Sequence, residues 1–112
     1  EKKKLLALLN KYNTPGVVFL TGDKHFSGIT RKYGMLEIMS SGMTHTKKGF
    51  IVKSYMKLLF ERTFFKKNFA IVDIHWDRSP LQIEVEFKGK KKSKKTLFKL
   101  SKNQFTIKEK IK

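Results

Sequence analysis

Asp23 and His25 stand two residues apart, directly after an apolar run and a glycine, within Val17-Val18-Phe19-Leu20-Thr21-Gly22-Asp23-Lys24-His25-Phe26. A carboxylate and an imidazole at this spacing in extended chain point to the same side and can both reach one metal centre. The same two residues also suit a turn-capping aspartate and an ordinary loop histidine. The pair therefore indicates either a metal site or a polar loop.

The elements before the pair would position it. Four apolar residues, 17–20, lead into Thr21, which predicts a strand at 17–21 that is buried on both faces. Gly22 permits a sharp turn at the end of that strand. Asp23 and His25 would then lie beyond the carboxyl end of a strand, where open α/β sheets place their ligand chemistry. Residues 1–12 carry leucines on one face and predict an amphipathic helix before the strand.

A second strand with a small polar turn is expected next. Residues 34–41 include the apolar Met35, Leu36, Ile38 and Met39, and the segment ends in the small polar turn Ser40-Ser41-Gly42-Met43-Thr44-His45. Small hydroxylated residues at a strand end can bring backbone N–H groups close to an anion. They are equally ordinary turn residues, which is the simpler interpretation.

Residues 46–67 are basic and carry apolar side chains, which predicts an amphipathic helix or a long surface insertion. A basic amphipathic helix can lie on an anionic membrane. Packing against the rest of the protein is the interpretation that we prefer.

The remaining chain predicts antiparallel strands. In the strand expected at 68–76, Asp73, His75 and Asp77 alternate, which suits a metal trio but more simply the wet face of a half-buried strand. Residues 81–87 alternate apolar and polar side chains and give the clearest strand. The Lys-rich segment 88–95 is expected to be a hairpin loop before a partner strand at 96–100. Residues 101–112 fit a further strand or a helical tail.

Positive charge dominates the composition, with 26 Lys and Arg against 9 Asp and Glu in 112 residues and a net charge of +17. Lysines spread along the whole chain supply most of it, whereas specific recognition of bases and phosphates favours arginine. Nucleic acid and anionic membrane are therefore possible partners that we do not favour. The absence of cysteine excludes disulfides and thiol chemistry.

No apolar run approaches the roughly 20 residues of a membrane span, and no signal peptide is visible. The first residue is Glu, which suggests a fragment or a processed chain. No compartment is predicted.

Four segments occur in an order that resembles a known family. They are Leu5-Leu6-Ala7-Leu8-Leu9, Pro15-Gly16 through Phe26, Glu37-Ile38-Met39 through His45, and Asn68-Phe69-Ala70 with Asp73-Ile74-His75-Trp76-Asp77. Over about residues 5–87 the chain looks like the C-terminal part of alkaline phosphatase D-like metallophosphoesterases of the calcineurin-like superfamily. The combination of Gly-Asp-x-His-Phe with Ser-Ser-Gly carries most of the resemblance.

The resemblance implies an α/β (α+β) fold, the C-terminal portion of a four-layer α/β/β/α sandwich with two metal ions at the strand ends. Asp23 and His25 match the last ligand pair, so that by analogy His25 holds the first metal and Asp23 the second. The metals would be iron, zinc, manganese or calcium.

Further residues are carried over only as support. Ser40, Ser41 and Gly42 match a loop near the family's site, and His45 matches a family position without an assigned role. Lys24 and Arg31 flank the motif and are weak candidates for attracting phosphate. The chain departs from the family at Gly28, where relatives often have an acidic residue.

The resemblance implies hydrolysis of phosphoesters, as a phosphatase or phosphodiesterase, but the family's other ligands are absent from this chain. Two ligands cannot hold a dinuclear site, so an N-terminal portion of the same protein, covalent or separate, would complete it. The alternatives are a basic nucleic-acid- or anionic-lipid-binding module without catalysis, and a structural subunit. We expect one partial domain, with a helix–strand–metal loop–strand unit at 1–45, the insertion at 46–67 and the antiparallel strands at 68–112.

Overall fold

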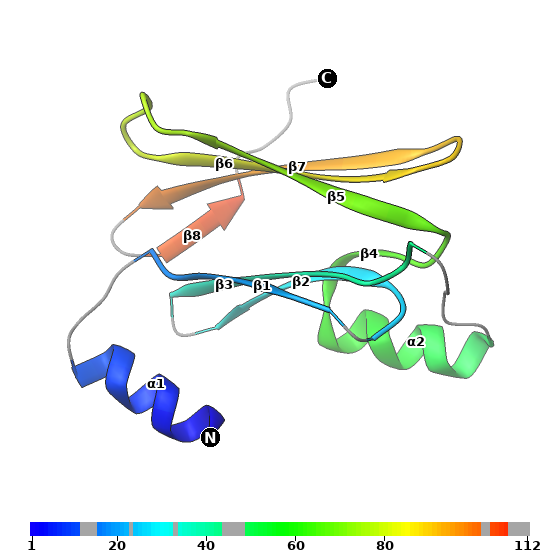
Figure 1. Ribbon diagram of the computed structural model, residues 1–112, viewed down its shortest axis with the longest axis horizontal. Helices are drawn as coiled ribbons and strands as arrows, with labels where there is room; N and C mark the ends of the chain where they lie inside the picture. The colour runs from blue at the N-terminus through cyan, green and yellow to red at the C-terminus, as the bar shows by residue number, and fades with distance from the viewer. Residues whose placement is uncertain (12–15, 23, 33, 44–48, 102–103, 108–112) are drawn as a thin grey trace.

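The computed structural model describes residues 1–11, 16–22, 24–32, 34–43, 49–101 and 104–107. In this part of the chain the fold is α+β, with two helices and two four-stranded sheets. The sheets lie face to face, and both helices lie on the side of the first sheet that faces away from the second (Figure 1). The described elements thus form three layers: sheet, sheet and helices.

The first sheet is mixed, with the strand order β1-β3-β2-β4. Its strands are β1 (Val18–Thr21), β2 (Ser27–Lys32), β3 (Met35–Ser40) and β4 (Glu61–Phe64). β1 runs parallel to β3, and β2 is antiparallel to both β3 and β4. The connection from β1 to β2 must therefore cross the end of β3.

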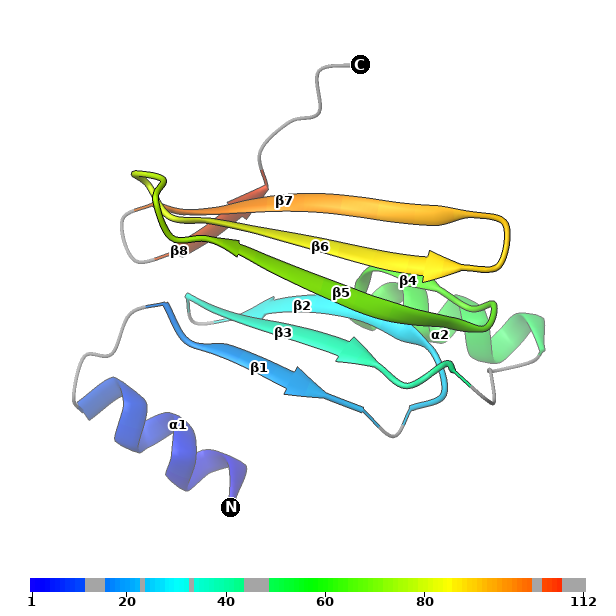
Figure 2. The same cartoon turned by 45° about the horizontal axis from the view of Figure 1, so that its top comes forward.

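The second sheet is an antiparallel meander in the order β5-β6-β7-β8 (Figure 2). Its strands are β5 (Asn68–His75), β6 (Gln82–Gly89), β7 (Ser93–Ser101) and β8 (Gln104–Ile107). Alternate residues of β6 are buried, as the alternating sequence predicts.

The core lies between the two sheets. The first sheet contributes aliphatic side chains and one aromatic ring, and the second sheet contributes more aromatic rings. The buried apolar residues of this cluster are Ile29, Leu36, Ile38, Phe64, Ile83, Val85, Phe87, Phe98 and Phe105. Burial of these side chains is the main force that holds the two sheets together.

The helices α1 (Lys2–Lys11) and α2 (Phe50–Leu59) contain no buried residue. The first was predicted at 1–12, and the described residues confirm it up to Lys11. The second occupies part of the segment 46–67, which also contains β4. Neither of these described helices is long and apolar enough to span a bilayer.

The strands predicted at 34–41, 68–76, 81–87 and 96–100 are confirmed. A strand within 17–21 is also confirmed as β1, but its predicted burial on both faces is wrong, because Leu20 is 71% exposed. β1 is the edge strand of its sheet among the described strands, and β3 is the one described element that it contacts extensively, so the other layers do not fully cover its faces. The predicted hairpin loop at 88–95 is shorter, since β6 continues to Gly89 and β7 starts at Ser93. The strands β2 and β4 were not predicted.

Candidate functional site

His25 lies in the connection that follows β1, at the edge of the sheet where β1 and β3 both end. The parallel register pairs Thr21 with Met39, so the carboxyl ends of these two strands lie side by side. The His25 side chain is exposed, and its backbone has a φ of 60°, in the left-handed region. Asp23 and His45, the other two motif positions expected here, lie outside the described residues.

Direct hydrogen bonds join this connection to the turn after β3. The backbone N–H of His25 donates to Ser41 Oγ at 2.8 Å. The backbone N–H of Ser41 donates to the carbonyl oxygen of Phe26 at 3.2 Å. Gly-x-x-His-Phe and Ser-Ser-Gly, which are distant in sequence, therefore form one unit at the strand ends.

A buried amide, Asn68, holds this unit from the other sheet. Asn68 is 4% exposed, and its Oδ1 accepts a 2.6 Å hydrogen bond from Ser27 Oγ. Its Nδ2 donates to the carbonyl oxygen of Lys66 at 2.6 Å, and its backbone N–H donates to the carbonyl oxygen of Gly42 at 2.9 Å. Asn68 thus forms hydrogen bonds with polar groups of β2, of the β4–β5 connection and of the turn after β3.

The glycine in the Ser-Ser-Gly turn is required by this packing. A Cβ atom at Gly42 would lie 2.9 Å from Asn68 Nδ2, closer than real Cβ contacts allow. Ser40 lies beside the same group, with its Oγ 3.3 Å from Ser27 Oγ. Ser41 therefore contacts His25, while its neighbours Ser40 and Gly42 contact Ser27 and Asn68.

Sequence reasoning gave no role to Ser27 or Asn68. Asn68 was noted only as part of the resemblance and as the start of a strand. A buried polar side chain must find hydrogen-bond partners, but its burial is not visible in a sequence in which asparagine commonly marks turns. The available signal is the position of Asn68 at the start of an apolar strand.

Aromatic rings pack against the connection between β1 and β2. Phe26 is fully buried, and its ring meets Phe60 edge to face at 5.1 Å and stacks on Phe65 at 5.3 Å between centroids. A Cβ atom at Gly28 would lie 2.9 Å from Phe60 Cβ. An acidic side chain, which the resemblance would place at this position, does not fit here without movement of Phe60.

The two flanking cations differ in position. Lys24 is exposed in the same connection as His25. Arg31 pairs with Leu36 at the opposite end of β3, so the fold does not bring it to the site. Its Nε and Nη2 each donate to the Glu61 carboxylate at 2.8 Å. These hydrogen bonds raise the pKa of Arg31 above its ordinary value, against the opposing effect of partial burial.

The described residues do not complete a metal site by themselves. They contain no group of three or more His, Cys, Asp or Glu side chains that could hold an ion. Asp73 and Asp77, two members of the trio considered on β5 and its following turn, are exposed. The imidazole of His25 fits a metal chemically, but a stable site needs further ligands.

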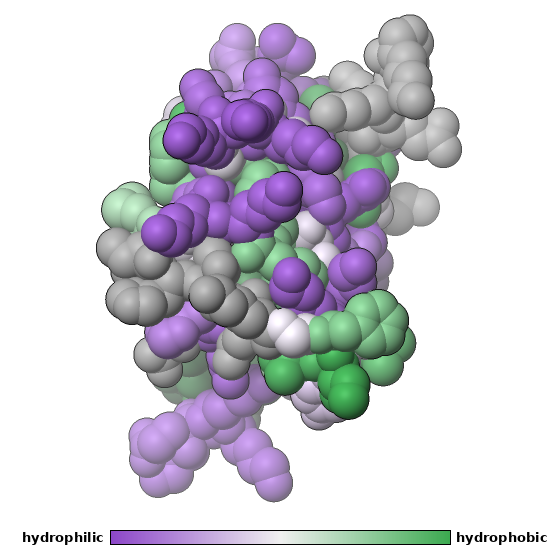
Figure 3. Space-filling view, turned by 90° about the vertical axis from the view of Figure 1, so that its right-hand side faces the viewer, coloured by the Kyte–Doolittle hydropathy of each residue, from purple (hydrophilic) through white to green (hydrophobic). Residues whose placement is uncertain are grey.

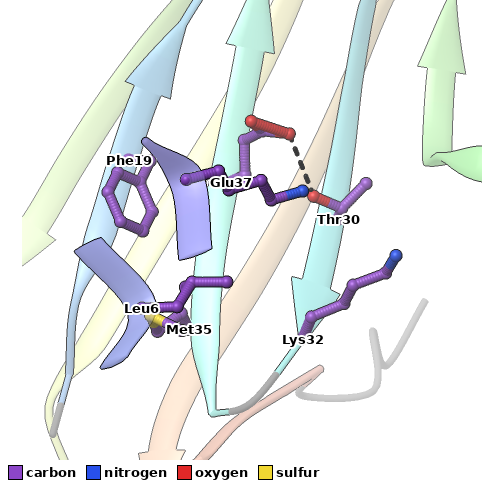
Figure 4. A pocket seen from close by; sticks show the side chains of 7 residues that line it. Leu6, Phe19, Thr30, Lys32, Met35 and Glu37 are labelled. Carbon is purple, nitrogen blue, oxygen red and sulfur yellow. Dashed lines mark hydrogen bonds between the residues drawn. The ribbon is translucent and has the colours of Figure 1, made fainter. Parts of the chain in front are cut away.

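A shallow pocket lies elsewhere, between α1 and the outer face of the first sheet (Figure 4). Leu6, Phe19 and Met35 give it apolar walls. Its polar side is occupied by Thr30 Oγ1, which donates to Glu37 Oε1 at 3.1 Å. No histidine lines this pocket, and the strand-end unit around His25 stays the stronger candidate.

Comparisons of the chain with protein-family models, with curated proteins and with solved structures find no match.

Proposed function

We propose that this chain supplies one side of a dinuclear metal site that hydrolyses phosphoesters, with Asp23 and His25 as ligands. The observation that carries the proposal is the 2.8 Å hydrogen bond from the His25 backbone to Ser41 Oγ. It joins the two halves of the motif on which the resemblance to alkaline phosphatase D-like enzymes rests. Their common place at the ends of parallel strands is where α/β sheets bind ligands.

In this proposal the chain is the C-terminal portion of a four-layer α/β/β/α sandwich. Its apolar strand β1 is an edge among the described strands and leaves Leu20 exposed. The open edge and the exposed leucine support an N-terminal portion of the protein that packs beside β1 and completes the site.

When bound, the two metal ions, iron, zinc, manganese or calcium, supply Lewis acidity and activate water for the hydrolysis. Water adds its oxygen to phosphorus, the ester P–O bond breaks, and the alcohol leaves with a proton. Within the chain, His25 would offer an imidazole nitrogen as a ligand. Ser41 fixes the backbone of His25, and Asn68 fixes the turn that carries Ser41.

The test uses the whole protein, including the proposed N-terminal portion, and two variants, Asp23→Ala and His25→Gly. Glycine suits the left-handed backbone at position 25. The metal content is measured by elemental mass spectrometry, and hydrolysis is measured with bis(p-nitrophenyl) phosphate and p-nitrophenyl phosphate. Each variant should lose bound metal and about 100-fold or more of the activity, since even outer-shell changes cost 10- to 100-fold.

The matched control is His75→Gln, which changes a histidine on β5 in the other sheet. It should keep both the metal content and the activity. Unchanged metal content and hydrolysis in Asp23→Ala and His25→Gly would reject the proposed function.

A further inference from the structure

The helix α2 presents a stripe of apolar side chains to solvent. Ile51 and Leu58 are each 83% exposed, and Phe50 at the start of the helix is 85% exposed. Tyr55 and Leu59 continue the stripe and are also exposed. Positions 51, 55, 58 and 59 follow the i, i+4, i+7, i+8 spacing of one helix face. A solvent-facing helix normally shows polar residues on that face.

The helix is fixed in this orientation by contacts on its other side. Lys53 Nζ lies 5.9 Å from the centroid of the Phe65 ring, in a cation–π contact. The C-cap residue Phe60 donates its backbone N–H to Met56 and packs its ring against Phe26. A basic side chain of α2 therefore contacts the protein, while the apolar stripe faces outward.

A basic hairpin lies next to the strand that follows α2. Lys94 of β7 donates from Nζ to the carbonyl oxygen of Thr63 at 2.8 Å. A Cβ atom at Gly89 would lie 2.8 Å from Phe64 Cζ, so the hairpin backbone rests on the β4 ring. The tip of this hairpin, Lys90 to Lys92, is exposed. Thus β4 connects the apolar helix to the lysine-rich hairpin.

Figure 3 shows the end of the molecule that carries α2. Hydrophobic side chains form a cluster around this helix, and hydrophilic side chains cover much of the remaining surface. The helix has no acidic residue. Exposed basic residues occur on α2, on β4, in the β4–β5 connection and in the hairpin: Lys57, Arg62, Lys66, Lys67, Lys88, Lys90, Lys91 and Lys92. Apolar and positive surface are therefore combined at one end.

We propose that this end of the molecule, the α2 stripe together with the Lys90–Lys92 hairpin tip, docks on an anionic lipid bilayer. Apolar side chains of an amphipathic helix enter the boundary between headgroups and acyl chains, and lysines nearby attract anionic headgroups. The two contributions are needed together, because a single weak anchor gives only marginal membrane binding. The net charge of +17 complements the anionic surface. The helix lies on the bilayer surface.

The proposal is tested by co-sedimentation of the purified protein with vesicles of phosphatidylcholine alone or with phosphatidylserine added. Binding is expected with the mixed vesicles and should weaken as salt rises. The double variant Ile51→Ser/Leu58→Ser should reduce the partition coefficient by about tenfold or more, because two inserted side chains are lost. Lys90→Ser/Lys91→Ser should reduce it by about tenfold.

Matched controls lie elsewhere on the molecule. Leu8→Ser removes an exposed leucine from α1, and Lys3→Ser/Lys4→Ser removes two exposed lysines from the same helix. Both controls should bind the mixed vesicles within about twofold of the unchanged protein, a difference well below the loss expected for each lysine at the bilayer surface.

A fluorescence reporter distinguishes insertion from attraction by charge alone. Trp76 is the one tryptophan of the chain and follows β5 at the other end of the strand from Asn68. In a Trp76→Phe background, Phe50→Trp should shift its emission to the blue on mixed vesicles and be quenched by brominated lipid. The unchanged protein, with Trp76 alone, should show neither effect.

Two results would overturn the proposal. One is the absence of binding to phosphatidylserine vesicles at low salt. The other is binding that the lysine variant weakens and the Ile51→Ser/Leu58→Ser variant does not, with equal affinity for single-stranded RNA. That pattern would identify a general polyanion surface, to which nucleic acid binds through charge.

Discussion

Ser27 Oγ donates a 2.6 Å hydrogen bond to Asn68 Oδ1, and the two residues are 41 positions apart. Ser27 begins β2 in the first sheet, and Asn68 begins β5 in the second. Both side chains are buried. The bond therefore connects the two sheets directly beneath the connection that carries His25, so the candidate site depends on how the sheets pack.

The first prediction concerns this bond. Asn68→Ala should lower the free energy of unfolding by about 1–3 kcal/mol, because Ser27 Oγ and the Lys66 carbonyl oxygen lose their partner inside the protein. Urea denaturation measures the change. Asn10→Ala, in the exposed part of α1, should change it by less than about 0.5 kcal/mol. Equal stability of the two variants would show that the buried network contributes nothing.

The second prediction concerns Gly28. Gly28→Ala should destabilise the fold by about 1–3 kcal/mol, since the new Cβ atom would meet Phe60 Cβ at 2.9 Å. Gly28→Glu should cost more, because it also brings a carboxylate to a buried position. The control is Gly22→Ala, whose Cβ atom would have its nearest neighbour at 3.6 Å. Thermal unfolding of the three variants gives the comparison, and tolerance of Gly28→Glu would contradict it.

The third prediction separates the backbone of His25 from its imidazole. With φ at 60°, His25→Gly should leave the stability within about 1 kcal/mol of the unchanged protein. His25→Val should destabilise by about 1–3 kcal/mol, because a β-branched residue is strained in the left-handed region. Denaturant titration of both variants tests this. Similar stabilities would mean that the connection relaxes to another conformation.

The fourth prediction compares two phenylalanines in the second sheet. Phe98 is fully buried in the core, whereas Phe69 is 43% exposed. Phe98→Ala should cost about 3–5 kcal/mol, and Phe69→Ala should cost clearly less. The two free energies of unfolding, measured in guanidinium chloride, should differ by about 2 kcal/mol or more. A smaller difference would argue against the core between the sheets.

The fifth prediction concerns Arg31 and Glu61. Their ion pair is partly exposed, so Glu61→Gln should cost less than about 1 kcal/mol, and high salt should reduce that cost. The raised pKa of Arg31 means that its contribution is complete below the ordinary pKa of arginine and is lost only above its folded pKa. Arg31 should therefore add no pH dependence to stability near neutral pH. A double-mutant cycle with Arg31→Lys, followed across neutral pH, checks both statements.

Strands with a strong apolar pattern could be predicted from the sequence, and strands without one could not. The alternation in 81–87 predicts β6 because each apolar residue has a place between the sheets. β2 has Ser, Gly, Thr, Arg and Lys at five of its six positions, so its membership depends on pairing with β3 and β4. β4 is four residues long and comes shortly after α2. It could not be recognised as a strand because it lies within the segment 46–67, which was expected to be a helix or an insertion.

The candidate site was predictable only in part, for a similar reason. The sequence placed His25 after one predicted strand and the Ser-Ser-Gly turn after another, and the structure brings these two segments together. Asp23 lies outside the described residues. Local sequence did not show that the Arg31 guanidinium donates its hydrogen bonds to Glu61. Nor did it show that Asn68 is buried against the Ser-Ser-Gly turn. Those relationships arise from sheet order and from the contact between the two sheets.

The strand order β1-β3-β2 has a consequence for how the protein assembles. β2 and β3 are neighbours in sequence and pair as a hairpin, whereas β1 must reach across the end of β3. Local pairs form faster than distant ones. We therefore expect the β2–β3 hairpin to form first and β1 to dock on it afterwards. The segment that carries His25 then takes its shape in the last step, after the strands on either side of it are in place.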